Sequence, residues 1–241
     1  MIRDCFTVLV LVCLLASPLQ ALDPWFGAKI GTSVGSPVPF GNIPAGASGS
    51  PILGLVAGAW VDWYATGTWS VCNEVHYVHY GSSFSTPLVN HPIIDRVPVS
   101  APDGTTVIYE VETVFTGTAT GEFSNDYIQL PVYAAWKAFD RWRFTGGGYV
   151  GWLVSTNSYA VGTGQVGIRP EVVQKDMYFN EKINGVDYGL HLGSQYLAFD
   201  DLYLDMRATL GLTSVFDEEF RTVDRTVQNF YVHLTLAYRV F

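Results

Sequence analysis

The chain has 241 residues and a formal net charge of −9, with 49% hydrophobic and only 15% charged residues. A soluble domain of this size would carry roughly a quarter charged residues, so apolar surface is in excess and lipid is one environment that can accept it. The negative charge argues against nucleic acid as a partner, because phosphate backbones are bound by basic side chains.

The N-terminal segment has the organisation of an export signal. Arg3 precedes an apolar run over residues 6–16, and a short segment then ends at the small residue Ala21. An uncleaved anchor would need about 20 apolar residues, roughly twice this run, and no later stretch is long enough to span a membrane as a helix. We therefore expect a signal peptide over residues 1–21 and one domain over residues 22–241. Cys72 would then be the only cysteine of the exported chain, so no intrachain disulfide could form.

The remaining chain is predicted to be all-β. Eight stretches have the composition and alternation of strands, and each is at least about as long as the 9–11 residues that a tilted strand needs to cross a bilayer. In chain order they are approximately residues 25–36, 51–63, 68–82, 126–139, 141–156, 185–199, 202–214 and 227–241.

The connections between these strands alternate strictly between short and long. The short ones are residues 64–67, the corner at Asp140 and the pair Asp200-Asp201, and the long ones are residues 37–50, 83–125, 157–184 and 215–226. Outer-membrane barrels have short periplasmic turns and long external loops, whereas nothing in a soluble β-sandwich requires such an order. Within the longest link, residues 105–123 are rich in Thr, Val and Tyr. They are expected to form a hairpin or to extend the neighbouring strands beyond the membrane.

The two faces of each strand differ in chemistry. In the last strand an apolar stripe alternates with a face that is polar, small or charged: Phe230, Val232, Leu234, Leu236 and Tyr238 against Tyr231, His233, Thr235, Ala237 and Arg239. A soluble lipocalin-like barrel would place the charged face outside, but here the apolar face must be outside, which only lipid tolerates. Aromatic residues near strand ends are expected to form interfacial girdles: Trp25, Trp63, Trp69, Tyr77, Trp136, Trp142, Trp152 and Tyr238.

These patterns predict an eight-stranded antiparallel up-and-down transmembrane β-barrel with short periplasmic turns and long external loops. Eight strands enclose a lumen that side chains can fill, so charged groups there must pair or be solvated. We expect Glu74 and Asp205 each to contact one or more of the arginines, in a closed lumen. The predicted polar network comprises Lys29, Glu74, Lys137, Arg143, Asp205, Arg207, His233 and Arg239.

The sequence predicts no catalytic, cofactor or metal site. The five histidines are scattered, and no Gly-x-Ser-x-Gly elbow is present. His76 and His79 fall on opposite faces of one strand, which excludes both a chelate and a catalytic pair. The acidic residues Asp217, Glu218 and Glu219 match no defined cation site and are interpreted as a solvated loop.

Several stretches resemble the PorT-like family of outer-membrane β-barrel proteins. The matching motifs are Tyr-Ile-Gln-Leu-Pro-Val at residues 127–132, Gly-Gly-Tyr-Val-Gly-Trp-Leu at 147–153, Asp-Tyr-Gly-Leu at 187–190, Tyr-Leu-Asp-Met-Arg at 203–207, Gly-Leu-Thr at 211–213, and Ala-Tyr-Arg with a terminal Phe at 237–241. The resemblance implies a barrel in the bacterial outer membrane that the barrel-insertion machinery assembles. It implies no single activity, although some members take part in type IX protein secretion.

The leading interpretation is a non-enzymatic outer-membrane barrel that acts through its external loops or through a secretion or envelope partner. The alternatives are a small-solute channel, a lipid-modifying barrel enzyme and a soluble lipocalin-like carrier. Leu236, Tyr238 and Phe241 form the predicted assembly signal, although Val240 puts Phe241 out of phase with the apolar stripe. We therefore predict that deleting Phe241 impairs assembly less than replacing Leu236 or Tyr238 with Asp.

Overall fold

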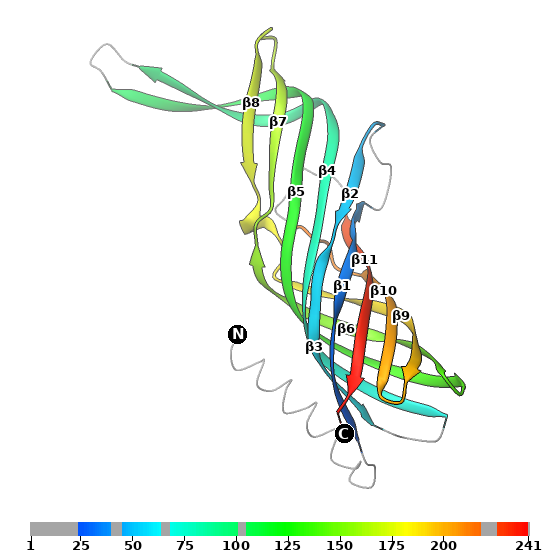
Figure 1. The fold of residues 1–241 in the computed structure, drawn as a ribbon. Helices are drawn as coiled ribbons and strands as arrows, with labels where there is room; N and C mark the ends of the chain where they lie inside the picture. The colour runs from blue at the N-terminus through cyan, green and yellow to red at the C-terminus, as the bar shows by residue number, and fades with distance from the viewer. Residues whose placement is uncertain (1–23, 40–44, 64–67, 101–104, 218–225, 241) are drawn as a thin grey trace.

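The computed structural model describes residues 24–39, 45–63, 68–100, 105–217 and 226–240. The predicted signal peptide, the turn at residues 64–67 and Phe241 lie outside these residues. The described residues form eleven strands and one 3-10 turn (Asn180–Lys182), arranged as Figure 1 shows. The strands are β1 (Trp25–Pro39), β2 (Ser48–Ile52), β3 (Gly54–Trp63), β4 (Trp69–Ser100), β5 (Thr106–Phe139), β6 (Trp142–Thr156), β7 (Tyr159–Val166), β8 (Val172–Tyr178), β9 (Val186–Phe199), β10 (Leu202–Gly211) and β11 (Val227–Arg239).

Eight of these strands close into a barrel, as the sequence predicts. The ring runs β1-β3-β4-β5-β6-β9-β10-β11, and every neighbouring pair is antiparallel. β11 closes the ring on β1 through a continuous register from Gly27↔Arg239 to Pro39↔Val227. None of the described residues forms a helix that is long and apolar enough to cross a membrane.

The barrel wall is apolar outside and mostly polar inside. On β11 the side chains of Leu234, Leu236 and Tyr238 are about half exposed (47–53%), whereas Tyr231 and His233 are 1–3% exposed. Every backbone group of a closed barrel finds a partner in the wall, so the strands can meet lipid without unpaired edges. The predicted assignment of faces is confirmed for this strand.

Two of the predicted short turns are present at one end of the barrel. Asp140-Arg141 joins β5 to β6, and Asp200-Asp201 joins β9 to β10. Aromatic side chains gather near this end on the outer wall, including the stacked pair Trp69–Trp136 with ring centroids 6.0 Å apart. This is the arrangement expected of an interfacial girdle.

Beyond the barrel, β4 and β5 continue to pair as far as Ser100↔Thr106. β7 pairs along β5, β8 adds to β7, and β2 adds to β4, giving an outer sheet in the order β2-β4-β5-β7-β8 (Figure 1). Residues 105–123 were expected to form a hairpin or to extend the neighbouring strands, and nearly all of them lie in the extension of β5 that pairs with β4. β7 and β8 were not predicted, because the link over residues 157–184 was interpreted as a loop. Likewise, the stretch predicted as one strand over residues 51–63 is divided at Leu53 between β2 and β3.

A small apolar core lies where the outer sheet meets the barrel. Its buried members come from β5, β7, β11 and the two long links that precede β9 and β11: Phe123, Ala160, Phe179, Ile183, Val215, Phe216 and Val227. An isolated bridge between Ile183 and Phe216 ties the two links together. This cluster covers the outer end of the lumen, directly beyond Thr213 and Asn229.

Candidate functional site: lumen network and outer sheet

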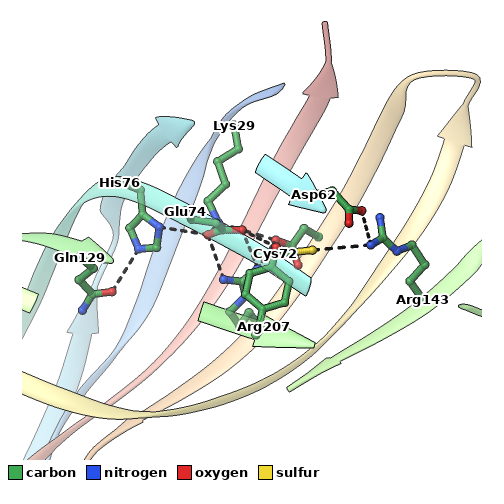
Figure 2. A network of polar contacts seen from close by, with 10 residues as sticks. Lys29, Asp62, Cys72, Glu74, His76, Gln129, Arg143 and Arg207 are labelled. Atoms are coloured by element: carbon green, nitrogen blue, oxygen red, sulfur yellow. Dashed lines mark hydrogen bonds and ion pairs between the residues drawn. The ribbon is translucent and has the colours of Figure 1, made fainter. Parts of the chain in front are cut away.

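Glu74 is the centre of the lumen network. Its carboxylate accepts hydrogen bonds from Lys29 Nζ at 2.5 Å, from both terminal nitrogens of Arg207 at 3.0 Å, and from the hydroxyl of Tyr133 at 2.6 Å. These four residues come from β4, β1, β10 and β5, so they meet across the barrel from several sides. Figure 2 shows Lys29 and Arg207 on either side of Glu74. Period-two alternation directs each of them into the lumen.

Asp205 completes the central cluster. Its carboxylate accepts from Arg207 at 3.1 Å and lies 3.8 Å from Lys29 Nζ. The prediction that both Glu74 and Asp205 contact an arginine is therefore confirmed, and it is the same arginine. Two cations face two carboxylates, and all four residues are at most 5% exposed. Such balance is what allows charges to remain in a dry interior, because an unpaired buried charge is strongly destabilising.

A second ion pair lies nearer the short-turn end. Arg143 of β6 donates to Asp62 of β3 at 2.5 Å and to the hydroxyl of Ser70 at 2.7 Å. The thiol of Cys72 is 3.7 Å from the same nitrogen (Figure 2). The thiol is buried, and it is the only described cysteine.

On the other side of Glu74, histidine, glutamine and tyrosine side chains continue the network. His76 lies 3.3 Å from Glu74 and 3.1 Å from Gln129, which in turn donates to the hydroxyl of Tyr80. Tyr80 stacks on Tyr231, with ring centroids 3.9 Å apart. His233 is buried in the lumen as predicted, where its Nε2 is 3.3 Å from the Tyr80 hydroxyl.

Asp187 was not among the predicted site residues. It is buried near the outer end, and its carboxylate accepts from the side chains of Thr213 (2.6 Å), Tyr149 (2.9 Å) and Asn229 (3.1 Å). Within the described residues no cationic side chain reaches it. One signal could have revealed it, because Asp187 stands four residues before His191 and therefore on the same face of β9.

Two predicted members lie outside the network. Lys137 is exposed at the short-turn end of β5. Arg239, at the corresponding end of β11, pairs with Asp201 (Nε to Oδ1, 2.7 Å) and lies over the ring of Trp25. Both are on the lumen face, as predicted, but they sit where the barrel opens to water. The prediction that they belong to the buried network was wrong.

The outer sheet ends in a two-stranded segment, residues 92–100 of β4 with residues 106–114 of β5, which we call the ribbon. An ion pair between Asp95 of the ribbon and Lys175 of β8 connects it to the β7–β8 hairpin. A shallow groove lies between them, lined by apolar residues such as Val97 and Val173 as well as by this pair.

The ribbon exposes more apolar surface than its position in water would suggest. The side chains of Ile94 and Ile108 are 62% and 63% exposed, and the other exposed apolar members are Val99, Val107, Tyr109, Val111 and Val114. Val107, Tyr109 and Val111 share one face of the ribbon by alternation, and apolar surface on a water-exposed segment is a common feature of interaction sites. For the described part of the chain, no cluster of three or more His, Cys, Asp or Glu could hold a metal ion.

The family model described as the outer membrane protein beta-barrel domain matches residues 25–217. The chain belongs to this family. It is a protein of the bacterial outer membrane, as predicted, and its apolar wall contacts membrane lipid. The alternative of a soluble lipocalin-like carrier is therefore excluded.

Solved outer-membrane barrels are similar to the chain at low identity. Ail of Yersinia pestis, in complex with the heparin analogue sucrose octasulfate, is 10% identical, with 90% of this chain and 99% of that one covered and a TM-score of 0.42. Neisserial surface protein A is 8% identical (90% and 96% covered, TM-score 0.36), and Escherichia coli outer membrane protein W is 12% identical (91% and 99% covered, TM-score 0.33). Such similarities assign no activity. The comparison with curated proteins gave no match.

Proposed function

We propose that this protein is a non-enzymatic outer-membrane barrel that binds another protein through its outer sheet. The observation that carries the proposal is the length and exposure of the β4–β5 extension. Residues 86–100 alone, at about 3.3 Å per residue, correspond to roughly 50 Å of strand beyond the part of β4 that pairs with β2 and β3. Exposed apolar side chains at its far end suit contact with a protein better than contact with water.

The packed lumen supports this role over that of a small-solute channel. The ion cluster around Glu74 fills one level of the barrel, and the aromatic cluster of Tyr80, Tyr127 and Tyr231 fills the next. The apolar core over the outer end adds a third obstruction. We expect purified protein in planar bilayers to give no conductance steps of the size that a sugar-sized pore produces. Regular steps of that size would favour the channel instead.

The arrangement of histidines supports a non-enzymatic role. His79 on the outer wall hydrogen-bonds to Asp126 at 2.7 Å, and Asp126 also accepts from Tyr77. Ser33 donates its hydroxyl hydrogen bond to the backbone carbonyl of His79, and the described hydrogen bonds of the His79 imidazole include no serine or cysteine that could serve as a nucleophile. A change in outer-membrane lipid composition that depends on His79 would overturn this part of the proposal.

Membership of the PorT-like family remains a finer proposal within the broader family. It carries the expectation that the barrel-insertion machinery assembles the protein and that its partner belongs to a secretion or envelope system. The motifs at residues 127–132 and 203–207 support it.

A photo-crosslinking amino acid tests the proposal directly. Placed at Tyr109 of the ribbon, it should form an adduct with another protein in intact cells. Placed at Tyr188, which is similarly exposed (52% against 55%) but on the barrel wall, it should not. Absence of an adduct from Tyr109 and from further ribbon positions would contradict a binding role for the outer sheet.

A further inference from the structure

The two edges of the ribbon are not equivalent. In the described structure no third strand pairs with either strand of the ribbon, and its one backbone contact with the β7 side is at Val114, so both strands have an outer edge. Sheet edges present rows of backbone donors and acceptors to any extended chain nearby, and natural proteins usually block them with proline, charge or a bulge.

The β4 edge is blocked by two prolines. Pro92 pairs with Val114 and Pro98 pairs with Ile108. Since proline has no N–H, neither can belong to a hydrogen-bonded antiparallel pair, so their backbone nitrogens point to the outer edge. Two of the donors that this edge would otherwise offer are therefore missing.

The β5 edge has no proline. Val114 and Ile108, the register partners of Pro92 and Pro98, must also direct their backbone N–H and C=O groups away from β4. Because this orientation alternates along a strand, the backbone groups of Glu112 point the same way. An independent contact agrees with this direction, because the carbonyl of Val114 accepts from the amide of Gly167 on the β7 side at 2.7 Å. Ile108 and Glu112 thus present backbone donors and acceptors along a strand rich in β-forming residues.

The side chains around this edge are accessible on both faces. Every residue from Thr106 to Glu112 is exposed. One face carries Val107, Tyr109 and Val111, and the other combines Ile108 with the carboxylates of Glu110 and Glu112. A strand added here would meet apolar side chains on one face and negative charge on the other.

We propose that the β5 edge of the ribbon, from Thr106 to Glu112, binds an extended segment of another protein by β-strand addition. The bound segment would alternate basic residues, one of which faces Glu112, with apolar residues on the opposite face. This inference rests on the proposed binding role of the outer sheet and names the edge and the chemistry of the partner.

A second copy of this chain fits the edge less well. The Thr106–Glu112 segment has no lysine or arginine, so antiparallel self-pairing would place no basic residue opposite Glu112. A basic segment supplies that complementary charge. Dimerisation that an Ile108→Pro variant abolishes would identify the second copy as the occupant and overturn the proposal.

A pair of proline variants tests the edge. The probe is a fluorescent nine-residue peptide of alternating lysine and valine, added to the full chain in phosphatidylcholine nanodiscs. Ile108→Pro removes an outward donor from the β5 edge, and we expect at least a tenfold loss of affinity. Ile94→Pro is the matched control, because Ile94 is equally exposed and also directs its N–H outward, but on the β4 edge. It should change affinity less than twofold. Equal effects of the two variants, or no effect of either, would overturn the proposal.

Two further measurements do not depend on how well the proline variants fold. Peptides N-methylated at alternate residues present only one hydrogen-bonding edge, so one of the two methylation patterns should bind and the other should not. Glu112→Lys should weaken binding of the lysine peptide and strengthen that of a matched glutamate peptide. Peptide binding that is unaffected by both the methylation pattern and Glu112→Lys would contradict strand addition. If crosslinking from Tyr109 succeeds while these tests fail, the binding role of the outer sheet stands and only the edge mechanism is wrong.

Discussion

The barrel wall and the ribbon both expose apolar side chains, but they do so in different surroundings. On the wall, residues such as Leu234 belong to a band that faces lipid, and the polar groups behind them are paired in the lumen. On the ribbon, residues such as Ile108 are exposed to a similar extent beyond the membrane, with no packed interior behind them. Lipid around the barrel therefore accounts for the exposed apolar surface of the wall. Lipid does not account for that of the ribbon, which indicates a binding partner.

The largest contrast should come from the buried charge at the centre of the lumen. Glu74→Ala leaves Lys29 and Arg207 without their main counter-charge, so we expect the free energy of unfolding to fall by about 3–5 kcal/mol. Urea titration in detergent micelles, followed by tryptophan fluorescence, measures this. Glu122→Ala in the outer sheet removes a carboxylate with no described ion pair and should cost less than about 0.5 kcal/mol. Similar losses of unfolding free energy in both variants would contradict the expected difference between the lumen and the outer sheet.

A charged substitution on each apolar surface tests whether that surface contacts lipid or water. Leu234→Arg puts a cation near the middle of the membrane-facing band, with an expected cost of about 2–4 kcal/mol. Ile108→Arg on the ribbon should change stability by less than about 0.5 kcal/mol, because the side chain is already in water. The same titration in lipid vesicles compares them, and a ribbon variant as unstable as the wall variant would show that the ribbon is buried against something.

The hydroxyl of Tyr133 allows the lumen and the ribbon to be compared at the level of one hydrogen bond. Tyr133→Phe removes the donor to Glu74 while keeping the ring beneath Arg207, and the loss of a hydrogen bond to a charged group should cost about 1.5–3 kcal/mol. Tyr109→Phe in the ribbon should be neutral in unfolding titrations. Loss of stability in the Tyr109 variant alone would reverse the ranking of the two regions.

Removing the ribbon altogether should also have only a small effect on barrel stability. His91 and Phe115 are register partners, so an Asn-Gly turn can replace residues 92–114 with little strain. The losses include the part-buried Asp95–Lys175 ion pair, the hydrogen bond from Gly167 to Val114 and a long hairpin, and we expect a change of about 1 kcal/mol. Heat-modifiable migration on a gel should persist. A variant that no longer folds would show that the ribbon supports the barrel.

The sequence predicts much of this barrel because alternation reports which face a residue occupies. It gave the eight barrel strands, the lumen positions of Lys29 and His233, and the contacts of Glu74 and Asp205 with an arginine. Alternation does not report height along the barrel axis, which depends on the stagger between strands. Lys137 and Arg239 were therefore assigned to a network that they do not reach, and the partners of Asp187 could not be identified.

The outer sheet was predicted less completely, for a different physical reason. The β4–β5 extension keeps its alternation and was expected. In the 157–184 link the pattern is interrupted by Gly162, Gly164 and Gly167, so β7 and β8 do not stand out. Their pairing depends on a neighbour, β5, that the local sequence does not specify.

The closure of β1 on β11 has a consequence for the order of folding. It joins strands about 200 residues apart, and closing a loop of that length costs roughly 4–5 kcal/mol of chain entropy, whereas β4 and β5 meet through a short connection. Contacts between distant segments form slowly, and local hairpins form quickly. We expect the β4–β5 hairpin to form early and the β1–β11 seam to form last. Until that seam forms, the barrel has two open edges of its own.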